Sequence, residues 1–178
     1  MIANPPMASR AGDRILKVNH AGEHGAVAIY RGQLLAGRLH ARTLLAELAE
    51  FKAHEERHRS IFARELARRG LGRCRSYWLC GAGGFALGIV TGLLGQGAMA
   101  NTTVAVERVV LRHLERQLQE LERIDPAAVT AISAIVGDER EHHDRSAARA
   151  GQGGVLNRML AACVSGATEA VIWIGMRV

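Results

Sequence analysis

The chain has 178 residues, of which 48% are hydrophobic and 22% charged, and it carries a formal net charge of +6. This length suits one well-buried domain, and the composition excludes a disordered chain. Aromatic residues make up only 4%, too few for the stacking platforms that bind single-stranded nucleic acid, so we expect no nucleic-acid partner. The positive charge instead favours an anionic membrane surface. Three cysteines without CxxC spacing exclude a disulfide framework and a zinc knuckle.

The pattern of apolar residues predicts an all-α protein. No proline occurs between Met7 and Asp125, which favours long helices over a turn-rich β fold. We expect a flexible N-terminus over residues 1–12 and a single domain over residues 13–178. Asp13 is the expected N-cap of the first helix, and Asp125-Pro126 is expected to open the fifth. The other boundaries follow apolar periodicity and glycine breaks, and they predict helices over 13–36, 42–69, 77–95, 102–122 and 155–173.

Residues 77–95 form an uninterrupted run of apolar or small residues that is long enough to span a bilayer. Within the run, Gly84, Gly88 and Gly92 recur every four residues, a spacing that lets another helix backbone approach closely. Three interpretations are open: a buried core helix, a helix in the membrane interface, or a transmembrane span. We favour the interfacial helix because it agrees with the basic character of the chain.

Two short motifs carry the candidate chemistry. Glu55 is followed three residues later by His58, and Glu139 is followed three residues later by His142. No other glutamate of the sequence has a histidine at this spacing. Residues three apart share one face of a helix, so each motif presents a carboxylate and an imidazole side by side.

The spacing of two further glutamates matches these motifs. Glu23 precedes Glu55 by 32 residues, and Glu107 precedes Glu139 by the same interval. The midpoints of both intervals fall at predicted turns, near residues 39 and 123. Two helices that fold back at each turn would bring each glutamate pair to the same height. The sequence therefore predicts two helical hairpins, each contributing one Glu and one Glu-x-x-His.

The carboxylates lie on helix faces that are otherwise apolar, and burying four of them without counter-charge would be costly. Two divalent cations would supply the matching charge. Oxygen ligands with two imidazoles suit iron or manganese better than zinc. Glu from two helices and Glu-x-x-His from two others define ferritin-like carboxylate bundles. We therefore expect a ferritin-like bundle, with four core helices as two hairpins plus two additional helices. Its expected metal ligands are Glu23, Glu55, His58, Glu107, Glu139 and His142.

Other polar residues give weaker signals. His54 and Glu50 lie one turn apart on a charged face, so we expect solvent exposure. His143 should point away from the site, and His113 should be a surface histidine or a core histidine with a satisfied hydrogen bond. Three arginines after the second motif indicate a solvated face rather than a phosphate site: Arg140, Arg145 and Arg149.

From Asp13 to Val178 the chain resembles the demethoxyubiquinone hydroxylase family, the di-iron monooxygenases of ubiquinone biosynthesis. The resemblance implies that the six residues above bind two carboxylate-bridged irons, and that the third helix takes a polyprenyl quinone from the membrane. His113 is followed by Leu114, where the family commonly has a His-Tyr pair. The matching segments are 19–26 (NHAGEHGA), 29–33 (IYRGQ), 84–88 (GFALG), 97–100 (GAMA), 104–107 (VAVE) and 138–144 (DEREHHD).

The expected reaction is O2-dependent hydroxylation of a 5-demethoxyubiquinone-type ring, with electrons from an external donor because the chain lacks a flavin or NAD fingerprint. We expect a peripheral protein at the cytoplasmic face of the cell membrane, with a second copy of the chain or another ubiquinone-biosynthesis protein as partner. Two alternatives remain open: a ferritin-like ferroxidase or iron-binding bundle, and a non-catalytic peripheral membrane helical protein.

Overall fold

The computed structural model describes residues 7–38, 41–150 and 154–177. Within these ranges the chain is all α-helical and contains no strand, so the predicted fold class is confirmed. The helices are α1 (Met7–Ala36), a short 3-10 helix (Arg42–Leu44), α2 (Leu45–Arg68), α3 (Tyr77–Leu94), α4 (Gln96–Leu121), α5 (Pro126–Ser133), α6 (Val136–Ala150) and α7 (Val155–Gly175).

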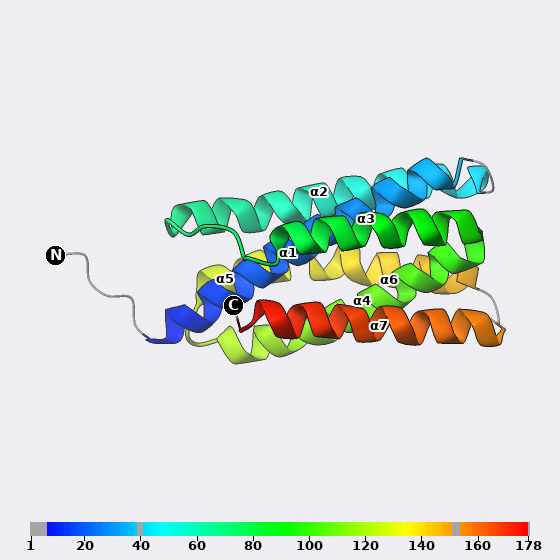
Figure 1. Ribbon diagram of the computed structural model, residues 1–178. Helices are drawn as coiled ribbons and strands as arrows, with labels where there is room; N and C mark the ends of the chain where they lie inside the picture. Colours follow the sequence, from blue (N-terminus) through cyan, green and yellow to red (C-terminus); the bar gives the residue numbers. More distant parts are fainter. Residues whose placement is uncertain (1–6, 39–40, 151–153, 178) are drawn as a thin grey trace.

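The helices form two antiparallel pairs with two outer helices (Figure 1). α1 packs against α2, and α4 packs against α6. α3 covers α1, and α7 runs along α4. Two hairpins and two additional helices were predicted, and both hairpins are present, although the second contains an extra break.

That break divides the predicted fifth helix into α5 and α6. Asp125 caps α5 as expected, because its Oδ1 accepts a hydrogen bond of 3.0 Å from the backbone N–H of Ala128. The helix ends at Ser133 and α6 starts at Val136. Residues 133–137, which span the break, have the sequence Ser-Ala-Ile-Val-Gly, and most of them have weak helix propensity. The predicted continuous helix was therefore wrong at this point.

Two helices begin earlier than predicted. α1 starts at Met7 because residues 7–11 contain no helix breaker, and α4 starts at Gln96 directly after Gly95, whose φ is +96°. Asp13 is consequently inside α1 rather than its N-cap, and its carboxylate accepts a hydrogen bond from Arg69 at 2.8 Å. Of the flexible terminus expected over residues 1–12, residues 7–12 are helical, and residues 1–6 lie outside the described residues.

In the described chain the buried apolar side chains form three clusters, of which two lie at opposite ends of the hairpins. One cluster joins the start of α1, the end of α2 and the end of α4 to α5, and it includes Leu16, Phe62 and Leu121. The other joins the end of α1 to the start of α2 and α4, and it includes Tyr30, Phe51 and Met99. Glu23, Glu55 and Glu107 fall between these clusters along their helices, and Glu139 lies one turn after Ile135 of the first cluster, so packed core lies at both ends of the site.

The glycine stripe of α3 allows the close approach of another helix, as predicted, and the structure shows that this helix is α1. A Cβ on Gly84 or Gly88 would collide with the backbone carbonyl of Gly25 or Ile29, and a Cβ on Gly32 of α1 would lie 2.6 Å from the carbonyl oxygen of Phe85. Such spacing requires glycine on both helices. The close packing holds α3 tightly to the bundle by one face.

The opposite face of α3 is exposed, so this helix is not a fully buried core helix. Its exposed apolar side chains include Trp78 at 69%, and α7 exposes Leu156 at 71%. Both α3 and α7 are long and apolar enough to cross a membrane by length and composition. The other large apolar residues exposed on the two helices are Leu79, Phe85, Val90, Leu93, Leu94, Val155, Met159, Trp173 and Ile174.

Candidate metal centre

Six buried side chains from four helices converge in the middle of the bundle. They form two groups, and in each group the potential ligand atoms lie within 4.8 Å of one another. Two carboxylates, Glu55 of α2 and Glu139 of α6, belong to both groups. The first group adds Glu23 of α1 and His58 of α2, and the second adds Glu107 of α4 and His142 of α6. These are all six residues that the sequence singles out.

The facing atoms of the cluster are close together, yet they do not satisfy one another. The Nδ1 of His58 lies 2.9 Å from Oε1 of Glu139, and the Nδ1 of His142 lies 3.1 Å from Oε1 of Glu55. Within the described chain, none of these four atoms has a partner in hydrogen-bond geometry. Buried polar atoms are almost always paired, so four unpaired atoms aimed at shared points fit a bound cation.

The pKa shifts of the clustered side chains in the protein without metal also fit a cation site. Burial, together with the neighbouring carboxylates Glu55 and Glu139, raises the pKa of both Glu23 and Glu107 well above its usual range. Burial alone would lower the pKa of His142, but the carboxylates of Glu139 and Glu55 raise it to about 9. The cluster therefore retains protons at neutral pH, and divalent cations could replace them.

Each histidine of the cluster is held from outside by its second ring nitrogen. The Nε2 of His58 lies 2.8 Å from Oδ2 of Asp138, which also accepts a hydrogen bond from Arg57 at 2.5 Å. The Nε2 of His142 lies 3.1 Å from Nδ1 of His54. The expectation that His54 is solvent-exposed was wrong, because its ring is half-buried and lies against His142. Glu50, one turn earlier, is exposed as expected.

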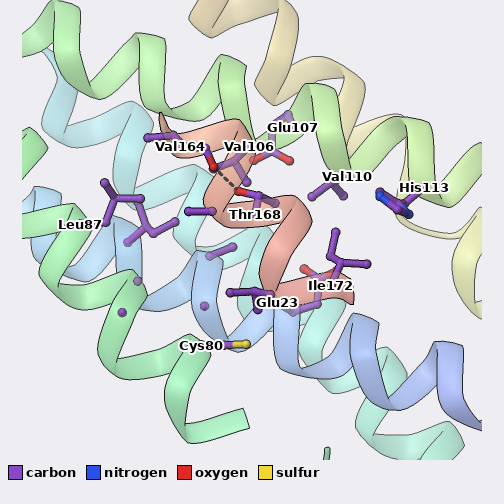
Figure 2. A pocket seen from close by; sticks show the side chains of 18 of the residues that line it. Glu23, Cys80, Leu87, Val106, Glu107, Val110, His113, Val164, Thr168 and Ile172 are labelled. Atoms are coloured by element: carbon purple, nitrogen blue, oxygen red, sulfur yellow. Dashed lines mark hydrogen bonds between the residues drawn. The ribbon is translucent and has the colours of Figure 1, made fainter. Parts of the chain in front are cut away.

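A cavity of about 430 Å³ runs to this cluster from the side of the bundle where α3 and α7 lie (Figure 2). Glu23, Glu55, Glu107 and Glu139 line one part of it. Apolar side chains of α1, α3, α4 and α7 line most of the rest, among them Leu87, Val106, Val110, Val164 and Ile172. Leu79 of α3 and Cys163 of α7 also line it and are exposed, so the cavity is open at this surface.

The remaining candidates lie outside the cluster. His113 lines the cavity, and its Nε2 lies 2.8 Å from Oε2 of Glu169 on α7, so this ring nitrogen is paired. His143 contacts its neighbour Asp144 instead of the cluster. The three arginines are matched by carboxylates: Arg140 with Glu115, Arg145 with Glu47, Glu50 and Glu141, and Arg149 with Glu47.

The fold and the site together define an all-α helical bundle whose core holds a cluster of carboxylates and imidazoles compatible with metal ions. The comparison with protein families agrees with this class. Residues 10–175 match the family model described as ubiquinone biosynthesis protein COQ7. The chain belongs to the COQ7 family of ubiquinone biosynthesis.

Individual relatives support the family assignment. The chain is 33% identical over 167 residues to a 3-demethoxyubiquinol 3-hydroxylase of Rhodospirillum rubrum, covering 93% of this chain and 78% of that protein. It is 30% identical over 170 residues to the mitochondrial NADPH-dependent 3-demethoxyubiquinone 3-hydroxylase of Dictyostelium discoideum, covering 93% and 77%. It is 35% identical over 138 residues to the Homo sapiens protein of that same name, covering 74% and 62%.

Proposed function

We propose that this protein is a di-iron monooxygenase that hydroxylates the ring of a 5-demethoxyubiquinone-type substrate, a polyprenyl benzoquinol, in ubiquinone biosynthesis. The observation that carries the proposal is the position of the carboxylate cluster, which forms part of the wall of a cavity that is otherwise mostly apolar. The names of the relatives support the substrate class, since they are hydroxylases of demethoxyubiquinol or demethoxyubiquinone. One domain over residues 13–178 would hold all of these parts.

In this proposal the six clustered side chains would hold two irons. Glu23 and His58 would serve one iron and Glu107 and His142 the other, and Glu55 and Glu139, which belong to both groups, would serve both. When bound, the two irons would activate O2, and an external reductant would provide the two electrons that the reaction requires. The oxygen and nitrogen donors suit iron, because carboxylates and imidazoles are ligands that non-haem iron accepts.

The walls of the cavity bind and shield the substrate. A cavity of about 430 Å³ has the size of pockets that take small organic ligands. Its apolar side chains would contact the ring and the first isoprene units and exclude water from the cluster. His113, fixed by Glu169, is one of the polar side chains that line this cavity, with Asn19 and Thr168, and would orient a ring oxygen.

We further propose that α3 and α7 rest on the cytoplasmic face of the cell membrane and admit the quinone from the lipid. Both helices expose apolar side chains, and the open part of the cavity lies where these helices line it. Trp78 and Trp173 are exposed on them, and the guanidinium of Arg177 lies 3.7 Å from the Trp173 ring centroid. Aromatic and basic side chains are typical of the polar boundary of a bilayer.

The test combines metal content with product formation. Protein loaded anaerobically with ferrous iron should bind two irons per chain, and Glu139→Ala should lose most of them. Loaded wild-type protein, given O2, a reductant and a demethoxyubiquinol with a short isoprenoid tail, should yield the hydroxylated quinol with one oxygen atom from ¹⁸O2. Iron binding with ferric release and no quinol product would favour the ferroxidase alternative. Absence of stoichiometric iron would overturn the proposal.

A further inference from the structure

The two Glu-x-x-His motifs support each other through the residue that precedes each glutamate. Asp138 precedes Glu139 on α6 and contacts His58 of α2 at 2.8 Å. His54 precedes Glu55 on α2 and contacts His142 of α6 at 3.1 Å. The arrangement is therefore reciprocal: each motif provides the outer partner for the histidine of the other motif.

The two outer partners occupy equivalent positions, but they differ in charge. Asp138 is a carboxylate, whereas His54 offers a ring nitrogen. A histidine that binds a metal through Nδ1 carries its proton on Nε2, so both cluster histidines donate outward. His58 donates to an anion. His142 donates to the Nδ1 of His54, which can accept only when that nitrogen carries no proton and its ring is neutral.

The charge of the outer partner affects metal binding through the imidazole that lies between them. A hydrogen bond to a carboxylate fixes the ring and raises its basicity as a ligand more than a hydrogen bond to a neutral acceptor does. Arg57 shares the Asp138 carboxylate at 2.5 Å, but its side chain is 52% exposed, so water screens part of its charge. His58 is therefore the stronger metal ligand of the two histidines.

We propose that the two metal positions are inequivalent, with Asp138 and His54 as positioning residues that direct the first divalent cation to the Glu23/His58 position. The Glu107/His142 position fills second. This inference rests on the proposed two-metal centre, and it adds an order of loading that the six ligands alone do not give, because the two groups contain the same ligand types. Loss of an outer partner typically lowers metal affinity by about 10–100-fold, so the bias toward one position is of that order.

The test measures where one equivalent of metal goes. Crystals of the full chain prepared with one equivalent of Co²⁺ per chain give the occupancy of each position from anomalous scattering. In the wild-type protein the position beside Glu23 and His58 should hold about three to ten times the occupancy of the other, because one equivalent divides between two tight, independent positions as the square root of their affinity ratio. In solution, one equivalent of ⁵⁷Fe²⁺ followed by one of natural iron should give one dominant Mössbauer doublet, which reports the electronic state and not the activity.

Two variants change the bias in predictable ways. Asp138→Asn keeps a hydrogen-bond acceptor but removes the charge, and it should make the two occupancies nearly equal. His54→Asp gives both histidines a carboxylate partner, and it should equalise them by strengthening the other position. The matched control is Asp144→Asn, which removes a carboxylate of α6 that is 70% exposed and contacts only His143 among the hydrogen bonds of the described chain. It should leave the wild-type distribution unchanged.

The outcomes distinguish the order of loading from the existence of the two-metal centre. Equal occupancy in the wild-type protein, or a distribution that neither variant changes, would overturn the order of loading while leaving the two-metal centre intact. Failure of the wild-type protein to take up Co²⁺ or Fe²⁺ at all would overturn both. Because His54→Asp tests the opposite position from Asp138→Asn, the inference remains testable if one variant does not fold.

Discussion

The guanidinium of Arg69, at the end of α2, donates hydrogen bonds of 2.7 Å to both carboxylate oxygens of Asp125, the residue that caps α5. The same guanidinium contacts Asp13 of α1 and Glu65 of its own helix. Arg69 is therefore the cation that joins three helices at this end of the bundle. Its side chain is 11% exposed, so these contacts are only weakly screened by water.

Replacement of Arg69 should be strongly destabilising. Arg69→Met leaves the buried carboxylate of Asp125 without its cation, and we expect the free energy of unfolding to fall by about 3 kcal/mol. Arg68→Met is the matched control, since its side chain is 63% exposed, and it should change stability by less than about 0.5 kcal/mol. Urea denaturation of both variants measures the difference. Equal effects would contradict the role assigned to Arg69.

The contact between α3 and α1 predicts opposite effects on stability for alanine substitutions at two glycines of α3. Gly88→Ala places a methyl group against the backbone carbonyl of Ile29, and we expect a loss of about 1–3 kcal/mol. Gly83→Ala meets nothing within 4 Å and should gain about 0.5–1 kcal/mol through helix propensity. Thermal unfolding of the two variants tests the packing. A stabilised Gly88→Ala protein would mean that the helices are less close than described.

His20 should make stability depend on pH. Burial, and next the charges of Arg73 and Arg59, lower the pKa of His20 to about 4. Between pH 6.5 and 4 the unfolded chain binds a proton at this residue while the folded chain does not, so stability falls as pH falls. The loss approaches about 3 kcal/mol. His20→Gln cannot bind this proton, so its unfolding free energy should decline less over the same range. Parallel curves for wild type and variant would refute the assignment.

Filling the cavity should separate substrate binding from metal binding. Ala26 of α1 lines the cavity, and Ala26→Trp should lower quinol hydroxylation by at least about tenfold while the iron content stays at the wild-type value. Ala53→Trp, on an exposed position of α2, is the control and should retain activity. Loss of iron in Ala26→Trp would show that the substitution disturbs the cluster itself. Full activity would place the substrate elsewhere.

The exposed side chains of α7 should govern attachment to lipid. Leu156→Gln with Met159→Gln keeps the net charge and removes two side chains that are 71% and 60% exposed. Each would lose about 1.5–3 kcal/mol of transfer free energy, so vesicle binding should fall by about tenfold or more. Ile124→Gln, in the connection before α5, is the control. Flotation with vesicles of anionic and neutral lipid measures binding, and unchanged flotation of the double variant would contradict the proposed orientation.

Much of the arrangement of the site could be predicted from spacing. The Glu-x-x-His pattern depends only on helix geometry, and equal intervals before each motif depend only on turns at their midpoints. These local rules are enough to bring Glu23 level with Glu55 and Glu107 level with Glu139. The glycine stripe of α3 was predictable for the same reason, since a backbone contact needs no knowledge of the partner helix.

What the sequence could not supply depends on contacts between distant segments. His54 shares a face with charged residues, and only the position of α6 shows that its ring lies against His142. Asp13 has the residue type of a cap, yet its carboxylate is used by Arg69, 56 residues away. The break between α5 and α6 arises from weak helix propensities, whose small differences did not outweigh the expectation of one long helix.

The two shared glutamates have a consequence for how the halves of the chain stay together. The α1–α2 half provides three of the four groups for one position but takes Glu139 from the other half, and the α4–α6 half takes Glu55 in return. Neither half can complete a position alone. A bound ion would thus act as a reversible cross-link between segments that are at least 52 residues apart in sequence. Separation of the halves would require release of the ions first, so occupancy of the centre would set how often this core opens.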